Sequence, residues 1–497
     1  MKLLLNTSSI EDYRKFLAIK QLPTYRFRGC IAEFPDEYAE RIGVDVEHKE
    51  SAEYVPHPLL FDYQAAIARM AIEKQRFSIF ADCGLGKTLI FLEFAKHAAS
   101  ELQATGKRVL IVSPLMVIKQ TIAEAKRFYG AAIELEQIPA SDLQQWMDGD
   151  GTAIGITNYD AMRDELTRGN IGALILDESS MLKSHYGKWG TKCIELGRGC
   201  QWKMACTGTP APNDRIEYAN HAVFMDAFPT VNSFLATYFV NRGQTGERWE
   251  LKGHALRPFY RALSHWSIFL TNPATYGWSD NTEPLPPIRI HYHDVALTDE
   301  QKAIIGMESG ELFARHMGGI TSRSVMGQIA KGTYKGKDIP TNKTRAIVDL
   351  VESWPDESTI VWCIYNREQE LLSKALPEAA SIRGSTPHDE RQRLVDGFKA
   401  GEIKVMISKP RILGFGLNLH IATRQVFSGL HDSYEEFYQA VKRSNRYGAT
   451  KPLNVHIPLT DIEEPMISNV IRKAKMVERD AEEQEALFRS QNIGAKV

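Results

Sequence analysis

The chain has no long hydrophobic run, few cysteines and almost no net charge. No apolar run is long enough to cross a membrane, and the apolar start at residues 2–5 is too short for a signal peptide. We therefore expect a cytoplasmic protein with no membrane partner. The formal net charge of −2 excludes a globally basic surface, so a nucleic-acid interface must be a local patch or a cleft.

The six cysteines lie at positions 30, 83, 193, 200, 206 and 363, and none has the C-x₂-C spacing of a zinc site. Buried, reduced thiols are the simpler interpretation, and they fit a reducing compartment. What the chain does have is 497 residues, of which 43% are hydrophobic and 25% charged. This composition is typical of a protein with full-sized cores and about two to four domains.

The most informative stretch is residues 77–88, where a short apolar run leads into a glycine-rich turn and then a helix-like segment. The turn, residues 82–88 (D-C-G-L-G-K-T), has the form of a phosphate-binding loop. Its glycines let backbone N–H groups approach phosphate oxygens. Lys87 can reach the β- and γ-phosphates of ATP, and the Thr88 hydroxyl can hold Mg²⁺. A glycine turn with a solvated lysine is the alternative, but strand, loop and helix together favour nucleotide binding.

Strand-like runs alternate with helix-like segments in both halves of the chain. The runs are residues 108–112, 153–157, 173–176 and 203–206, and then 359–364, 404–408, 425–427 and 454–457. This alternation predicts an α/β fold in which mainly parallel sheets are flanked by helices. Ligands in such sheets bind where the strands end, so the polar residues after each run are candidate site residues.

The acidic pair Asp177-Glu178 follows one of these runs directly. Asp177 can hold Mg²⁺ through its water shell, and Glu178 can act as the general base that polarises the attacking water. A solvated acidic pair at a strand end is the alternative. With a phosphate-binding loop in the same half of the chain, we favour the catalytic interpretation.

Two further features are weaker when taken alone. Gln64, upstream of the loop, offers an acceptor and donors that suit the edge of adenine. Arg443 and Arg446 lie three residues apart, on one face of a helix predicted from about Tyr434. Such arginines can neutralise the charge that builds on a transferred phosphoryl group. A solvated basic face is the alternative, because Lys442 lies beside them.

Taken in order, these segments resemble the motifs of the superfamily-2 helicases and, within that superfamily, of the Snf2-like ATPases. The matching segments are Tyr63-Gln64, residues 82–88, Ser113-Pro114, Thr157-Asn158-Tyr159, Asp177-Glu178-Ser179-Ser180, Thr207-Gly208-Thr209-Pro210 with Asn213, and residues 360–365, 414–419 and 439–448. The resemblance extends over about residues 58–460. It implies two RecA-like lobes, each a mainly parallel sheet flanked by helices, with a helical insertion between them.

The resemblance also implies an order of domains. An N-terminal segment of unknown role (1–55) is followed by the ATP-binding lobe (56–212), the insertion and linker (213–340), the second lobe (341–460) and a C-terminal helix (461–497).

Individual residues receive roles in the same way. For catalysis the resemblance implies Lys87, Asp177, Glu178, Arg443 and Arg446, with Mg²⁺ held by Thr88 and Asp177. The residues expected to contact ATP are Gln64, Gly84, Leu85, Gly86, Lys87, Thr88, Gly416, Asn418 and Gln439. Those expected to contact nucleic acid are Ser113, Pro114, Thr157, Asn158, Thr207, Thr209 and Ser408.

The chain departs from the family's pattern directly after the acidic pair. Ser179 and Ser180 stand where many relatives have another residue and then histidine, which often links hydrolysis to the segment near Thr207. Residues 249–255 and 408–410 look most like the compact phage and prophage members of the family. That likeness implies the cytoplasm of a bacterium or of a phage-infected cell.

We predict an ATP-dependent DNA translocase or helicase, an ATP hydrolase that couples turnover to movement along DNA. The resemblance favours duplex DNA, which such a motor would hold through backbone contacts that are nearly independent of sequence. Two alternatives stay open. One is a strand-separating or RNA-directed helicase. The other is a nucleotide-gated subunit of a restriction or defence assembly, whose terminal segments, 1–55 and 463–497, would dock a protein partner.

Overall fold

The computed structural model describes residues 2–22, 25–34, 38, 39, 42–44, 54–184, 187–243, 248–279, 285–312, 320–413, 417–430, 433–446 and 448–489. The chain divides into two compact units, of which the first comprises Met1–Asn281 with Glu478–Val497 and the second Thr282–Val477. Within the described ranges, none of the helices combines the length and the hydropathy needed to cross a membrane.

The first unit is built on a parallel sheet. Over the described residues its strands have the order β12-β4-β9-β8-β5-β7-β6, and every neighbouring pair runs in parallel. The strands are β4 (Arg76–Ala81), β5 (Arg108–Ser113), β6 (Leu135–Gln137), β7 (Ile154–Asn158), β8 (Ile171–Asp177), β9 (Trp202–Thr207) and β12 (Ser267–Leu270). Strand β12 lies within the range that the sequence assigns to the insertion, and the finer five-part division of the chain stays a prediction.

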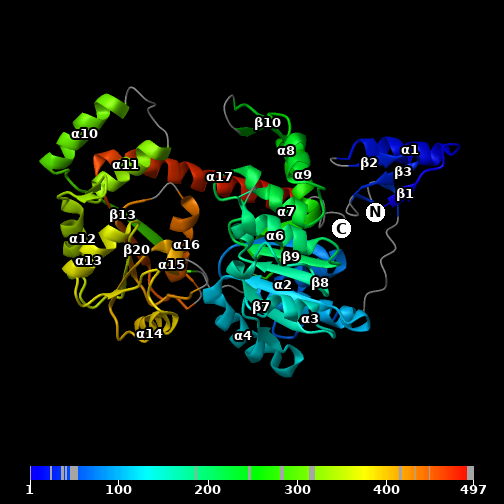
Figure 1. Ribbon diagram of the computed structural model, residues 1–497, viewed down its shortest axis with the longest axis horizontal. Coiled ribbons are helices and arrows are strands. Elements are labelled where there is room, and N and C mark those ends of the chain that lie inside the picture. Colours follow the sequence, from blue (N-terminus) through cyan, green and yellow to red (C-terminus); the bar gives the residue numbers. More distant parts are fainter. Residues whose placement is uncertain are drawn as a thin grey trace. The chain divides into compact units, whose positions relative to one another are not determined.

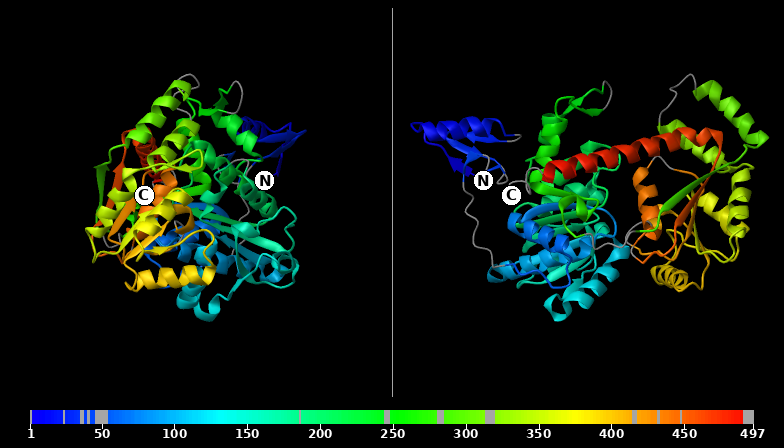
Figure 2. Two further views of the ribbon diagram at one scale, coloured as in Figure 1. Left: turned by 60° about the vertical axis from the view of Figure 1, so that its left-hand side comes forward. Right: turned by 180° about the vertical axis from the view of Figure 1, so that it is seen from behind.

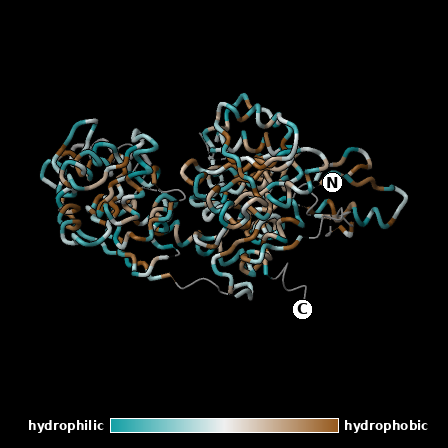
Figure 3. The backbone as a smooth tube through the Cα atoms, turned by 90° about the horizontal axis from the view of Figure 1, so that it is seen from below, coloured by the Kyte–Doolittle hydropathy of each residue, from teal (hydrophilic) through white to brown (hydrophobic). Residues whose placement is uncertain are grey.

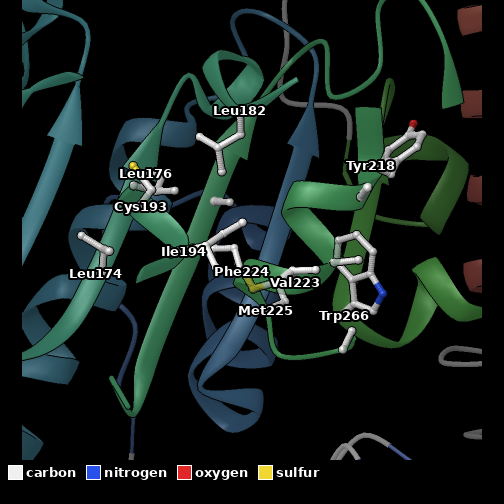
Figure 4. Close-up of a cluster of buried hydrophobic side chains, with 14 of the residues drawn as sticks. Leu174, Leu176, Leu182, Cys193, Ile194, Tyr218, Val223, Phe224, Met225 and Trp266 are labelled. Atoms are coloured by element: carbon white, nitrogen blue, oxygen red, sulfur yellow. The ribbon is translucent and has the colours of Figure 1, made fainter. Parts of the chain in front are cut away.

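Helices cover both faces of this sheet (Figure 1). One face carries α2 (Asp62–Lys74), α3 (Lys87–Leu102) and α4 (Leu115–Tyr129); the other carries α5 (Leu143–Asp148), α6 (Lys188–Gly197), α7 (Tyr218–Phe224), α8 (Val231–Tyr238) and α9 (Leu256–Trp266). The central strands are hydrophobic at most positions because their alternate side chains enter different cores. In β5, Val109 and Ile111 join the core under α2 and α3, whereas Leu110 and Val112 join the core under α6 and α7. Figure 4 shows this second core, where α6 and α7 pack against β8.

A small antiparallel sheet and its helix precede the first parallel sheet in the chain. It has the order β1-β3-β2, with β1 (Lys2–Leu4), β2 (Arg26–Arg28) and β3 (Ile31–Glu33), and α1 (Ile10–Lys20) contributes the buried Ile19 to its core. Elsewhere in the first unit, β10 (Phe239–Asn241) and β11 (Trp249–Leu251) form an antiparallel hairpin.

The second unit has its own parallel sheet, with the order β13-β20-β19-β16-β18-β17 over the described residues. Its strands are β13 (Ile288–Asp294), β16 (Thr359–Trp362), β17 (Ala380–Ser381), β18 (Val405–Ser408), β19 (Arg424–Phe427) and β20 (Leu453–Leu459), and a hairpin adds β14 (Thr333–Tyr334) and β15 (Lys337–Asp338). Strand β13, at the sheet's edge, pairs with β20 near the end of the unit (Figure 2). Hydrophobic segments, drawn in brown, gather in the interior of each unit (Figure 3), and in both parallel sheets the central strands contribute buried side chains to the core.

The helices of the second unit are α10 (Asp299–Leu312), α11 (Ile320–Ala330), α12 (Asn342–Glu352), α13 (Asn366–Ala375), α14 (His388–Lys399), α15 (Pro410–Leu413), α16 (Tyr434–Ser444) and the start of α17 (Glu464–Phe488). Helices α12 and α13 cover one face of the sheet. The predicted fold class, two RecA-like lobes with mainly parallel sheets, is confirmed.

The core of the second unit contains a buried cluster of charges. Glu463 accepts from Lys331 at 2.7 Å and from Lys343 at 2.5 Å, and all three side chains are almost fully inaccessible to solvent. Burial alone would raise the pKa of Glu463, but the two ammonium groups lower it to about 2. The carboxylate is therefore the charge that makes two buried lysines tolerable.

We expect Glu463→Gln to destabilise the second unit by about 3–5 kcal/mol, because it leaves buried ammonium groups without their counter-charge. Urea unfolding measures this, with Glu464→Gln as the control, since Glu464 is its exposed neighbour. Because the folded pKa lies below the unfolded value, the stabilisation is present above about pH 4.5 and is lost as the pH falls towards 2. Equal stability of the two variants would contradict this role.

Candidate active site

The glycine-rich loop joins β4 to α3 as the sequence predicts. Gly84 and Gly86 have φ angles of 92° and 68°, which a residue with a Cβ adopts only with strain. Gly86 is the N-cap of α3, so the helix N-terminus and its free N–H groups face the loop. Lys87 donates from Nζ to the carbonyls of Ala81 at 2.8 Å and Asp82 at 3.1 Å. The ammonium group is thereby held inside the loop, where phosphate oxygens would replace the two carbonyls.

The start of the loop is held by the strand that sequence reasoning missed. The Asp82 N–H donates to the carbonyl of Leu270, the last residue of β12, at 2.9 Å. Thr271, the next residue, donates to the carboxylate of Glu485 in the C-terminal part of α17. A short strand that pairs with a distant one gives no local signal, which is why the sequence did not reveal this support.

Asp177 is the last residue of β8, in the same sheet, and Glu178 follows it directly. The Asp177 carboxylate accepts from the Ser113 hydroxyl at 2.8 Å and from the Glu178 N–H at 3.0 Å. Burial and the neighbouring Glu178 raise the pKa of Asp177 to about 7, although Ser113 and Lys87 oppose the rise. A nearby cation therefore stabilises the ionised form. Because β4, β9 and β8 run in parallel, the loop after β4 and the acidic pair at the end of β8 lie at the same edge of the sheet.

The Glu178 backbone lies in the left-handed region, with φ 48° and ψ 50°. A non-glycine residue in this region is strained, and such strain concentrates at functional sites. Two buried hydrogen bonds hold the segment. The Tyr159 hydroxyl donates to the Asp177 carbonyl at 2.7 Å, and Ser179 Oγ lies 2.9 Å from Nε2 of His221. Sequence reasoning did not single out His221, since a lone histidine on a helix carries no motif signal.

Gln64 contacts the loop itself. Its Oε1 accepts from the Phe61 N–H at 3.0 Å, while its Nε2 lies 3.4 Å from the Leu85 carbonyl and from the Tyr63 hydroxyl. A Cβ at Gly86 would collide with this Nε2, so that glycine also permits a close approach. Gln64 is thus a positioning residue for the loop, and its contact with adenine stays a prediction.

The oxygens expected to hold Mg²⁺ fit that ion. Thr88 offers a hydroxyl and Asp177 a carboxylate, which are hard donors of the kind Mg²⁺ prefers. In the described residues there is no cluster of three or more His, Cys, Asp or Glu side chains that could hold a metal by itself.

The arginines predicted to complete the site belong to the second unit, and one part of that prediction is wrong. Helix α16 ends at Ser444, so Arg446 lies beyond it and does not share a helical face with Arg443. The helix stops because Asn445, its C-cap, leaves the helical region with ψ 77° and donates from its side chain to the Pro286 carbonyl. Arg443 is only 1% exposed, whereas Arg446 is half-buried and donates to the Leu417 carbonyl at 3.2 Å.

Three other residues of the second unit were expected to contact ATP. Gln439 is buried on α16 within reach of Glu435, and Asn418 accepts from the His420 backbone N–H. Gly416 lies outside the described residues. Their contact with ATP stays a prediction.

The residues predicted to contact nucleic acid fall into two groups. Those whose side chains are buried are Ser113, Thr157, Thr207, Thr209 and Ser408. Their hydroxyls are used inside the protein; Thr157, for example, donates to the Ile138 carbonyl and Ser408 to the Ile382 carbonyl. Pro114 and Asn158 are partly exposed at the ends of β5 and β7. Contact with nucleic acid stays a prediction for all of them, and the exposed pair is better placed for it.

The geometry defines a nucleotide-binding α/β protein with a phosphate-binding loop, an acidic pair at the end of another strand of the same sheet and a second sheet-containing unit. Two family models match the chain, the SNF2-related domain over residues 63–259 and the Helicase conserved C-terminal domain over residues 342–448. The chain belongs to the Snf2-like ATPases of helicase superfamily 2. The predicted enzyme class, an ATP hydrolase of the helicase type, is thereby confirmed, and the narrower likeness to phage members stays a prediction.

The chain is similar to longer proteins. It is 25% identical to the DNA annealing helicase and endonuclease ZRANB3 of Bos taurus over 328 residues, which cover 62% of this chain and 29% of that protein. It is 22% identical to the SWI/SNF-related matrix-associated actin-dependent regulator of chromatin subfamily A-like protein 1 of Drosophila melanogaster over 395 residues, covering 77% and 50%. The chain thus matches half or less of the length of each. A solved structure, the Sulfolobus solfataricus SWI2/SNF2 ATPase core in complex with dsDNA, has a TM-score of 0.39 and 19% identity, covering 88% of this chain and 98% of that one.

Proposed function

We propose that the protein is an ATP-driven motor that moves along duplex DNA. The observation that carries the proposal is the placement of the β4–α3 loop, with the Lys87 ammonium held inside it, and of the acidic pair Asp177-Glu178 at the same edge of one parallel sheet. The relatives' names, which include a DNA annealing helicase, support DNA as the track. As the sequence predicts, such a motor would work in the cytoplasm of a bacterial or phage-infected cell.

Each residue of the nucleotide site has a separate role in hydrolysis. Lys87 exchanges its two carbonyl partners for the phosphates of ATP, and the N–H groups at the start of α3 bind the same phosphates. Thr88 and Asp177 would hold Mg²⁺, which would neutralise charge on the phosphates. Glu178, whose backbone is fixed by its neighbours, orients and polarises the attacking water. Arg446 completes the charge balance when the second unit approaches.

The motor is expected to hold DNA mainly through the phosphate backbone. Affinity and stimulation should therefore fall steeply with salt and depend little on sequence. The chain's net charge of −2 requires this surface to be local. Pro114 and Asn158, at the ends of neighbouring strands, are the partly exposed residues from which we expect it to extend.

The test is the ATPase rate in the presence of duplex DNA, single-stranded DNA, RNA or no nucleic acid, at two salt concentrations. We expect the largest stimulation with duplex DNA and a loss of stimulation at high salt, with Lys87→Ala as the inactive control. Greatest stimulation by RNA or single strands would favour a strand-separating or RNA-directed helicase. A slow rate that rises only after a co-purifying nuclease or methyltransferase is added would favour the subunit of a defence assembly.

A further inference from the structure

A buried imidazole contacts the residue that follows Glu178. His221 lies on α7 and is fully inaccessible to solvent. Its Nε2 lies 2.9 Å from the hydroxyl of Ser179, the residue that follows Glu178. Burial lowers the pKa of His221 to about 4, although the backbones of Glu217 and Ser179 oppose the fall. The ring is thus neutral at physiological pH, and it interacts with Ser179 through a hydrogen bond between uncharged groups.

Helix α7 holds the segment after Glu178 through a second side chain. The Asn220 amide donates to the carbonyls of Leu182 and Ser184, both at 2.7 Å. Since Asn220 and His221 are adjacent, one turn of α7 contacts both the start of this segment, at Ser179, and its end, at residues 182–184. The helix is itself anchored, because Val223 and Phe224 pack into the core beside Leu174 and Leu176 of β8 (Figure 4).

The same helix also contacts the rest of the nucleotide site. Glu217, just before α7, accepts from the backbone and the side chain of Asn213 at 2.9 and 3.0 Å, which ties the helix to the segment after β9. On the other side, the His221 ring lies 5.3 Å from the ring of Phe80, one residue before the loop's strand ends. His221 thus touches both the strand that carries the loop and the segment that carries the base.

We propose that His221 is a positioning residue that fixes Glu178 through Ser179 and couples it, through α7, to the segment after β9. The inference deepens the proposed function and rests on it. Position 180, where many relatives have histidine, is here a buried serine whose hydroxyl has no partner among the described residues. In this chain the imidazole that contacts the segment comes from α7.

The experiment compares His221→Phe, His221→Gln, Ser179→Ala and the double variant His221→Phe/Ser179→Ala by steady-state ATPase kinetics and thermal unfolding. We expect His221→Phe and Ser179→Ala each to lower kcat about 10- to 100-fold with KM for ATP nearly unchanged, since a small displacement of a catalytic group has effects of this size. The double variant should lose no more than the worse single variant, because the two residues act through one hydrogen bond. His221→Gln, whose amide can reach Ser179, should recover most of kcat.

A folded Ser179→Ala protein with wild-type kcat would overturn the proposal, as would single-variant losses that multiply in the double variant. If His221→Phe does not fold, Ser179→Ala and His221→Gln still decide the question, because neither changes the volume of the core much. All rates are measured with and without duplex DNA. Absence of DNA stimulation in the wild-type protein would count against the proposed function, while the ratios of basal rates would still judge His221.

Discussion

Replacing Glu178 with glutamine is expected to lower the ATPase rate by about 10²–10⁴-fold while ATP still binds. Glutamine keeps the size of the side chain and the left-handed backbone of residue 178, but it cannot take a proton from the attacking water. The phosphate contacts come from the loop and Lys87, which this change leaves in place. Single-turnover hydrolysis and equilibrium binding of a labelled nucleotide, measured on the same protein, separate the two effects.

The matched control is Glu165→Gln, because Glu165 is an exposed glutamate in the same unit. It should hydrolyse ATP at the wild-type rate. Loss of nucleotide binding in Glu178→Gln would mean that the residue serves to build the site, not to activate water. Full activity would mean that another group acts as the base. Among the described residues the first candidate is Asp177, whose carboxylate accepts from the backbone N–H of residue 178.

The loop and the acidic pair could be predicted from the sequence because their chemistry is local. The signal of the loop lies in residues 82–88, the strand before them and the helix after them, and that of the acidic pair lies in two residues and one strand; the structure has these elements as expected. The buried strands were equally visible, since strands covered on both faces are hydrophobic at every position. Both the loop chemistry and the hydropathy of a buried strand depend on residues that are close together in the sequence, so they can be recognised without knowledge of distant parts of the chain.

The supports of the site could not be predicted, because they depend on pairings between residues far apart in the sequence. Leu270 holds the loop from β12, and His221 reaches Ser179 from α7. Neither residue is part of a sequence motif whose spacing indicates a chemical role. The same limit explains the wrong helical face: Arg446 has the spacing of a helical partner of Arg443, but a contact of Asn445 with the Pro286 carbonyl ends the helix first.

Replacing Arg446 with alanine is expected to lower the ATPase rate by about 10³–10⁵-fold, the range seen when an arginine finger is absent, with ATP affinity nearly unchanged. The structure favours Arg446 over Arg443 for this role. Arg446 is half-buried and lies in the irregular segment after α16, where its guanidinium donates to the Leu417 carbonyl at 3.2 Å. Arg443, at 1% exposure, is part of the interior of the second unit.

The comparison of three variants distinguishes a finger from a structural arginine. Arg443→Ala should destabilise the second unit in thermal unfolding, because it empties a space inside the protein. Arg446→Ala should unfold like the wild type and fail only in turnover, and Arg345→Ala, at an exposed position of α12, should do neither. If Arg446→Ala keeps its turnover while Arg443→Ala loses turnover without loss of stability, the buried arginine is the finger. That outcome would require the second unit to open around Arg443 before each hydrolysis step. The motor's cycle would then include a rearrangement within the second unit itself.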